Sequence, residues 1–426
     1  MMNTARLCWL IAAVANCRMM DYTGYALYRF RVDPSADTLR HLEAFDTEFD
    51  EATKTSRLQL DVWSEPSKSN PFADVLVAPE FTAKFRRMVI SEERRLIAKL
   101  RRRRKRSIDA WDHFDTHMYH SYGDMTRFMR SLARQKSDMV TIHHVATSYE
   151  HRQIYGVKIS KPGATRIDKP SFIIDAGVHA REWIAPAVAI YMIKYAVANY
   201  GVDERLTRSL NKFDWYIIPQ INPDGYEYSR NTDRLWRKTR SVNTTVNKWC
   251  MGADANRNWG YRWGEAGANR TPCSNIYMGS HPYSEPEIRG LKDFIAWNVT
   301  NPILYVSLHS YGQLLLSPWG YTNEKTANYL DQRKAAQLAV QSMRNTTGAS
   351  YNFGTISELM YPASGTSIDY MQHLGVPYIY GVELRPTDAP NSPAFNLPPE
   401  YIETTGKEML AAVYAISEHA VKVQRL

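Results

Sequence analysis

The sequence has 426 residues, which is too long for one ordinary domain and suits two or three segments. Hydrophobic residues make up 44% of it and aromatic residues 12%, so it can bury a large core and is expected to be globular. The formal net charge is +9, but six positive residues stand in one run, RRRRKR at 101–106, and little net charge remains elsewhere. A nucleic-acid-binding face is therefore not supported outside that run.

Residues 1–17 have the layout of a secretory signal peptide. Arg6 precedes an apolar run from Leu7 to Ala15, and small residues follow in an Ala-x-Ala arrangement. The run is too short to span a bilayer, and no later stretch is long and apolar enough to be a transmembrane helix. The sequence therefore predicts a secreted, extracellular protein with no membrane partner.

Cysteine usage agrees with secretion. Two of the four cysteines fall in the predicted signal peptide, which leaves Cys250 and Cys273 for a single disulfide. Asn-x-Ser/Thr sequons add little weight, because they are frequent by chance; they stand at Asn243, Asn269, Asn298 and Asn345.

A small α+β unit without a cluster of chemical residues is predicted at 22–100. Strand patterns lie at 25–32, 57–63 and 72–78, and helical spacing lies at 37–50 and 79–100. The basic run at 101–106 follows, and we interpret it as a cleavage site for a trypsin-like or furin-like protease, with the first unit as a pro-segment. The alternatives are a solvated basic helix face and a nuclear signal, and a signal peptide makes the second irrelevant.

Strands and helices alternate from 107 to 426. Short, apolar, β-branched runs predict strands at 140–146, 155–160, 171–177, 213–221, 302–310 and 377–384. Helical stretches are predicted at 185–201, 285–299 and 329–348. The pattern predicts an α/β domain whose mixed sheet is covered by helices on both faces. In such domains functional groups collect on loops at strand ends.

A metal site is the first candidate at these strand ends. GVHAREW places His179 and Glu182 directly after the strand at 171–177. A catalytic zinc site needs about three protein ligands and an open position, and His309, which closes the strand at 302–310, is the best third candidate. The His-x-x-Glu spacing is a weak signal by itself, and it differs from the helical His-Glu-x-x-His pattern, so Glu182 is not interpreted as a base.

A hydrolytic zinc site also needs a carboxylate that takes a proton from the attacking water. Glu383 stands near the end of the strand at 377–384, where a lone acid is costly to bury unless it is used or paired. The residues alone leave two interpretations open, a catalytic base and a structural salt bridge, for instance with Arg385.

Two further stretches offer groups that could bind a substrate. Arg237, Asn256 and Arg257 form a set of donors near the cysteine pair, and arginine suits bidentate recognition of a carboxylate. The alternative for these three is ordinary surface charge. Tyr361 lies in a Pro-Ala-Ser-Gly loop and could be a mobile hydroxyl, a pattern too generic to decide anything alone.

Taken together and in this order, the motifs resemble the secreted zinc carboxypeptidases of the A/B family. The motifs are HAREW, RLWRKTR, DANRNW, SLHSYGQLLLSPWGY, YPASGTSIDY and VELR. The resemblance covers nearly the whole chain, since RLQLDVW and DVLVAPE resemble the family's inhibitory pro-domain. It implies a metallocarboxypeptidase with a mixed, twisted, eight-stranded sheet flanked by helices. It also implies one Zn²⁺ per chain and synthesis as an inactive zymogen, and a monomer is expected.

The resemblance also implies roles for the motif residues. The zinc ligands would be His179, Glu182 and His309, with water in the open position. Glu383 would be the general base, and Arg237 would stabilise the oxyanion of the tetrahedral intermediate. Asp254 would accept a hydrogen bond from His179 and set its tautomer.

The implied partners are the C-termini of peptides and proteins. The substrate's terminal carboxylate would be held by Asn256, Arg257 and Tyr361. Residues further up the peptide would contact Arg181 and Tyr311. Such a carboxylate clamp suits an exopeptidase, because an internal peptide bond offers no charge to it.

Ile368 decides specificity in this interpretation, because its position lies at the base of the family's specificity pocket. Isoleucine cannot pair with a cation, so apolar or aromatic ends are expected, as in the A type. Gly320, Ile356 and Gly381 are expected to line the same pocket. The alternatives are a B-type enzyme that cleaves basic ends and a non-catalytic peptide-binding homologue.

Relatives carry a cis bond after the arginine of VELR, so a cis Arg385–Pro386 bond is expected.

Overall fold

The computed structural model describes residues 26–31, 48–50, 55–57, 60–64, 72–77, 79, 111–163, 169–242, 250–390 and 392–425. The chain divides into two compact units, Met1–Arg104 and Lys105–Leu426. The predicted signal peptide at 1–17, the basic run at 101–106 and the sequon at Asn243 lie outside the described residues. Within the described residues no helix is long and apolar enough to cross a membrane.

The first unit contains strands. An antiparallel sheet has the order β1–β5–β4, formed by Ala26–Arg31, Phe72–Val77 and Leu60–Ser64, and β2 (Glu48–Asp50) pairs with β3 (Thr55–Arg57). The helical spacing at 37–50 therefore gave a wrong prediction for its last three residues. Backbone pairing with β3 replaces the helix there, since tertiary context overrides a weak local preference.

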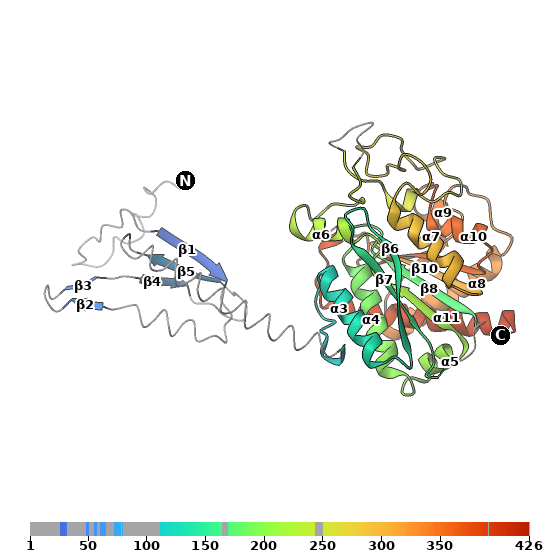
Figure 1. Ribbon diagram of the computed structural model, residues 1–426, viewed down its shortest axis with the longest axis horizontal. Coiled ribbons are helices and arrows are strands. Elements are labelled where there is room, and N and C mark those ends of the chain that lie inside the picture. Colours follow the sequence, from blue (N-terminus) through green and yellow to red (C-terminus); the bar gives the residue numbers. More distant parts are fainter. Residues whose placement is uncertain are drawn as a thin grey trace. The chain divides into compact units, whose positions relative to one another are not determined.

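The second unit is built on a mixed eight-stranded sheet, as predicted (Figure 1). Its order is β12–β11–β13–β10–β8–β9–β7–β6. The strands are β6 (Val140–Thr147), β7 (Gln153–Ile159), β8 (Ser171–Ala176), β9 (Asp214–Ile218), β10 (Pro302–Ser310), β11 (Leu314–Ser317), β12 (Asn352–Thr355) and β13 (Tyr378–Leu384). The central strands β13, β10, β8 and β9 are parallel to one another, and β6, β7 and β11 form antiparallel pairs.

All six predicted strands of this unit exist, and two further strands were missed. The strand predicted at 213–221 ends at Ile218, before Pro219. The missed strands, β11 and β12, have only four residues each, so they are too short to show a clear period.

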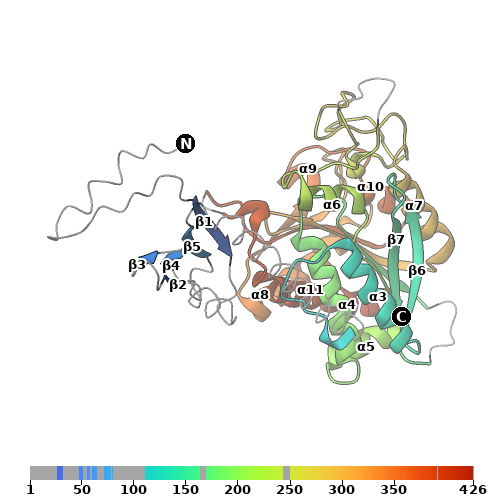
Figure 2. The same cartoon turned by 60° about the vertical axis from the view of Figure 1, so that its left-hand side comes forward.

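Helices cover both faces of the sheet, because each face carries its own apolar cluster. The first face packs against α3 (Tyr122–Gln135), α4 (Ile184–Asn199), α5 (Glu204–Lys212), α6 (Pro223–Asn231), α8 (Tyr329–Thr347) and α11 (Tyr401–Gln424). The second packs against α7 (Pro286–Asn298), α9 (Ile356–Leu359) and α10 (Ser367–His373). Figure 2 shows α4 and α7 on opposite sides of the strands. Short 3₁₀ turns lie at Trp111–His113, Ala255–Arg257 and Ala394–Asn396.

Local signals account for several helix ends. The Ser121 side chain caps α3 by accepting from the Asp124 amide, and Asp203 caps α5 by accepting from the Arg205 and Leu206 amides. The helix α8 ends at Gly348, whose φ of +78° favours glycine. The helix α4 is apolar nearly all round, which fits its burial against both the sheet and α11.

Two covalent features expected from the sequence are present. Cys250 and Cys273 form a disulfide, and the Arg385–Pro386 peptide bond is cis. Of the sequons in the described residues, Asn298 and Asn345 are exposed and Asn269 is half-buried.

A buried ion pair joins the end of β13 to α11. Arg385 donates to Glu408 from Nε (2.9 Å) and Nη2 (2.6 Å), and Thr347 and Tyr351 donate to the same carboxylate. Glu408 has no exposed surface.

We expect Glu408→Ala to lower the free energy of unfolding by about 3–5 kcal/mol, because it leaves the Arg385 guanidinium without its carboxylate partner. Urea unfolding followed by tryptophan fluorescence measures this.

The matched control is Glu418→Ala. Glu418 pairs with Arg205 at 2.9 Å, but both side chains are more than a third exposed. Such a pair contributes less than about 1 kcal/mol. Equal small losses in the two variants would contradict the structural importance of the buried pair.

Candidate active site

The candidate site lies where three neighbouring parallel strands end. The carboxyl ends of β8, β10 and β13 meet at one edge of the sheet, and His309 stands directly opposite Glu383 in the pairing of β10 with β13. After β8 the chain turns at Gly177, which has a φ of +73°, and a Cβ there would overlap the Gln220 side chain. This turn brings His179 back to the strand ends.

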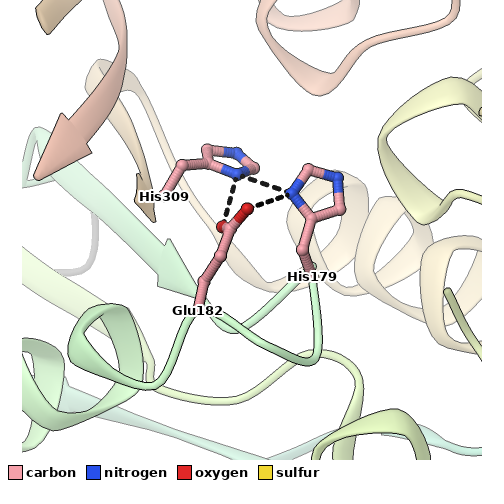
Figure 3. A group of neighbouring side chains, drawn as sticks. All are labelled: His179, Glu182 and His309. Atoms are coloured by element: carbon pink, nitrogen blue, oxygen red, sulfur yellow. Dashed lines mark hydrogen bonds and ion pairs between the residues drawn. The ribbon is translucent and has the colours of Figure 1, made fainter. Parts of the chain in front are cut away.

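His179, Glu182 and His309 converge on one point (Figure 3). His179 Nδ1 lies 2.8 Å from Glu182 Oε1, and His309 Nδ1 lies 3.2 Å from both Glu182 Oε2 and His179 Nδ1. All three side chains are buried. Within the described residues, this is the group of His, Cys, Asp or Glu side chains whose ligand atoms lie close enough together to hold a metal ion.

The donor set fits a zinc ion. Two nitrogen ligands of a tetrahedral zinc ion lie roughly 3.3 Å apart, given a Zn–N distance of about 2.0–2.1 Å. The two Nδ1 atoms are 3.2 Å apart, and each of them lies next to an oxygen of the Glu182 carboxylate. Two imidazoles and one carboxylate are also the ligand set of known catalytic zinc sites.

Asp254 links the metal candidates to Arg237. Its Oδ1 faces His179 Nε2 at 3.1 Å, and its Oδ2 accepts from Arg237 Nε (3.1 Å) and Nη2 (2.9 Å). Burial alone would raise the pKa of Asp254, but Arg237 and His179 outweigh it and hold the pKa well below its usual range. Burial likewise opposes ionisation of Glu182, yet the two histidines lower its pKa. Both acids are therefore carboxylates at neutral pH.

Glu383 differs from these two acids. Burial raises its pKa to about 7, although His309, Arg237 and Arg181 oppose the rise. The structural alternative, a salt bridge with Arg385, is wrong, because Arg385 pairs with Glu408 instead. No ion pair of the Glu383 carboxylate occurs among the described residues.

A cavity of about 350 Å³ opens at this edge, and most of the predicted site residues line it. They are His179, Arg181, Glu182, Arg237, Asn256, Arg257, His309, Tyr311, Tyr361, Ile368 and Glu383. Asp254 lies behind them, hydrogen-bonded to His179 and Arg237. Gly320 is not among the lining residues. A Cβ on it would press against the Ala363 carbonyl and contact Ile356, and both of these residues line the cavity.

Donors cluster on one side of the cavity. Arg257 is held by bonds from Nε to the Gly267 carbonyl and from Nη1 to the Asn256 carbonyl, both 2.9 Å. Its Nη2 has no hydrogen-bond partner within the described part of the chain. Tyr361 is 46% exposed, with the Arg257 guanidinium 6.0 Å from its ring centroid. This side of the cavity can accept an anion.

At the mouth, aromatic rings pack with a cation. The Arg181 guanidinium lies 4.3 Å from the Phe395 ring centroid, and the Tyr311 ring lies 5.0 Å from the same ring. The Arg234 side chain donates to the main-chain carbonyls of Arg181 and Phe395, which ties the loop after β13 to the loop after β8.

The other side of the cavity is apolar around Ile368. The sequence had singled out Ile356 and Gly381 there, and it missed Leu316, Met360, Ala363 and Thr366. These four lie within or beside the quoted motifs, but only the folding of β11 and of the loop before α10 brings them together. Asp388, an exposed acid in the long loop after Pro386, also lines the cavity and carried no sequence signal.

Comparison with known proteins decides the family. Residues 125–412 match the family described as zinc carboxypeptidase. The chain belongs to this family and is a metallocarboxypeptidase.

Relatives cover most of its length. Carboxypeptidase B of Astacus astacus is 39% identical over 70% of this chain and 96% of its own length. Carboxypeptidase A1 of Bos taurus is 33% identical over 94% of this chain and 95% of its own. The crystal structure of the carboxypeptidase A from Helicoverpa armigera, at 26% identity, superposes with a TM-score of 0.68 over 95% of this chain and 99% of that one. The fold and family predicted from the motifs are confirmed.

We expect this carboxypeptidase to bind one zinc ion per chain, and His309→Ala to abolish stoichiometric binding, because it removes one of three donors. Elemental analysis after dialysis measures the zinc content, and 1,10-phenanthroline should abolish peptide hydrolysis until zinc is restored. His281→Ala is the control, since His281 is an exposed histidine that does not line the cavity. Full zinc content in His309→Ala would contradict the ligand assignment.

Proposed function

We propose that this carboxypeptidase removes single residues with apolar or aromatic side chains from the C-termini of peptides and proteins. The observation that carries the proposal is the make-up of the cavity. Anion-binding donors and a convergent metal-ligand set line the cavity beside an apolar pocket that contains Ile368. Between them stands the Glu383 carboxylate, which forms no ion pair within the described residues.

Binding would begin at the substrate's terminal carboxylate. Asn256, Arg257 and Tyr361 would provide its donors, and the exposed Tyr361 ring would close over it. The terminal side chain would enter the apolar pocket, while Arg181 and Tyr311 contact the preceding part of the peptide. Only a chain end satisfies the donors and the pocket together, which makes the enzyme an exopeptidase.

Hydrolysis would use Glu383 and Arg237. His179, Glu182 and His309 would hold a zinc ion, which when bound supplies a Lewis acid that polarises the scissile carbonyl and lowers the pKa of water. Glu383 takes a proton from the attacking water and passes it to the leaving nitrogen as the C–N bond breaks. Arg237, held by two bonds to Asp254, stabilises the oxyanion that forms on the carbonyl oxygen.

A B-type preference for basic ends is the second candidate, because the Astacus relative is a carboxypeptidase B. The apolar surroundings of Ile368 argue against it, although the exposed Asp388 also lines the cavity. Asp369, the acid nearest to Ile368 in sequence, is fully buried, and its two oxygens accept from the amides of Gly320 (2.8 Å) and Tyr321 (3.1 Å). It is therefore not available to a substrate cation, which would also meet Arg181, Arg237 and Arg257 in the cavity.

The enzyme would be secreted as a zymogen. Residues 1–17 would direct secretion, residues 22–100 would inhibit the cavity of the domain at 107–426, and cleavage at 101–106 by a trypsin-like or furin-like protease would release activity. Support comes from the layout of the sequence and from the disulfide between Cys250 and Cys273.

Specificity is tested with two blocked dipeptides that differ only in ending in Phe or Arg, using protein cleaved at the basic run. We expect the wild type to release Phe, and Ile368→Asp to shift the ratio of kcat/KM values toward Arg by at least about 100-fold, because it exchanges an apolar contact for a partner of a buried cation. Ile368→Leu is the control and should keep the preference for Phe. Release of Arg by the wild type would favour the B-type alternative.

The proposed base is tested by pH. Because burial raises the pKa of Glu383 to about 7, the carboxylate is ionised above this pH and loses its charge as the pH falls. We therefore expect kcat/KM to fall on the acid side with a midpoint at or below about pH 7, since a zinc ion nearby favours the ionised form. Glu383→Gln should lower kcat by about 10²–10⁴-fold with little change in KM and should remove this acid limb. An unchanged acid limb in Glu383→Gln would assign the titration to another group.

A further inference from the structure

One face of the sheet carries a line of polar side chains leading away from His309. Tyr305, Ser307 and His309 alternate along β10 and so point to the same face. Asp175 stands on the neighbouring strand β8, opposite Ser307 in the pairing. Asp175, Tyr305 and Ser307 have no exposed surface, so each must find its hydrogen-bond partners inside the protein.

Hydrogen bonds connect His309 to Ser307 and Ser307 to Asp175. Ser307 Oγ lies 2.8 Å from Asp175 Oδ1 and 3.1 Å from His309 Nε2, and the Tyr305 hydroxyl donates to Asp175 Oδ2. Burial raises the pKa of Asp175, while the hydrogen bonds from the Tyr305 and Ser307 hydroxyls favour its ionised form. As a carboxylate Asp175 only accepts, so both hydroxyls then give their protons to it. Ser307 then has only lone pairs left for His309, and His309 Nε2 must carry the proton.

This protonation has a consequence at the other ring nitrogen. With the proton on Nε2, Nδ1 of the neutral imidazole presents a lone pair, and it is Nδ1 that faces Glu182 and His179. The second histidine reaches the same state by a shorter route, because His179 Nε2 contacts the carboxylate of Asp254 directly at 3.1 Å.

We propose that Ser307 and Asp175 form a positioning relay that fixes the ring orientation and the metal-binding tautomer of His309, as Asp254 does for His179. The relay rests on the proposed zinc site and adds two residues to it. Neither residue touches the substrate, and both act through His309. Asp175 lies on the neighbouring strand opposite Ser307, and the Ser307 hydroxyl connects it to His309. Asp254, in contrast, contacts His179 directly.

A purely structural role would be to tie β8 to β10. That role predicts that the two hydroxyls on Asp175 are equivalent, since each joins one residue of β10 to the same carboxylate. The relay predicts that they differ, because only Ser307 also contacts His309. Tyr305→Phe is therefore the matched control for Ser307→Ala.

The experiment measures the zinc dissociation constant of the full chain by competition with a chelating dye. We expect Ser307→Ala to raise it about 10–100-fold and Tyr305→Phe to change it less than about threefold. Thermal unfolding of the metal-free proteins shows that each variant folds. Ser307→Cys retains the size of the side chain and a weak S–H group, so it should fold and give an intermediate constant.

Asp175 is tested by a double-mutant cycle. An amide accepts a hydrogen bond more weakly than a carboxylate, so Asp175→Asn should also weaken zinc binding. It should have no further effect in the Ser307→Ala background, because the route to His309 is already broken.

Two results would overturn the relay while leaving the zinc site intact: unchanged zinc binding in Ser307→Ala and Ser307→Cys, or equal losses in Ser307→Ala and Tyr305→Phe. A wild-type chain that binds no zinc would instead overturn the proposed function, and the relay with it.

Discussion

The candidate site depends on the parallel pairing of β8, β10 and β13, whose carboxyl ends meet at one edge of the sheet. This pairing sets His309 beside Glu383 and brings the loop with His179 and Glu182 to the same place. The backbone hydrogen bonds of a buried sheet tolerate no slippage, since a shift by one residue would turn His309 into the apolar core. The positions of His309 and Glu383 are therefore set by the pairing of two central strands.

The same edge concentrates charge that must be balanced. Glu182 and Asp254 are buried carboxylates, Glu383 stands beside them, and Arg237 is the cation that bonds directly to Asp254. Arg181 and Arg257 line the same cavity, and a bound zinc ion would add positive charge next to Glu182. Asp254 contacts both His179 and Arg237, so it links the proposed metal ligands to the cation proposed to stabilise the oxyanion.

Much of the site could be predicted because its residues stand in short motifs at strand ends. The strands at 171–177, 302–310 and 377–384 were long and apolar enough to recognise, and each ends near a ligand or base candidate. The alternatives could not be resolved in the same way. Whether Glu383 paired with Arg385 depended on Glu408 in α11, which is remote in sequence and carried no signal. Ser307 and Asp175 were overlooked, although period-two alternation from His309 points to Ser307.

The sequence by itself determined the family, the fold class and the identity of the groups that meet at the site, because these follow from local motifs, hydrophobic periodicity and their order along the chain. Only the tertiary structure decided which acids form ion pairs and how Leu316, Met360 and Ile368 line an apolar pocket. It also decided which groups contact the Nε2 atoms of His179 and His309. The physical reason is that pairing, burial and tautomer depend on contacts between residues far apart in the chain, which local pattern does not encode.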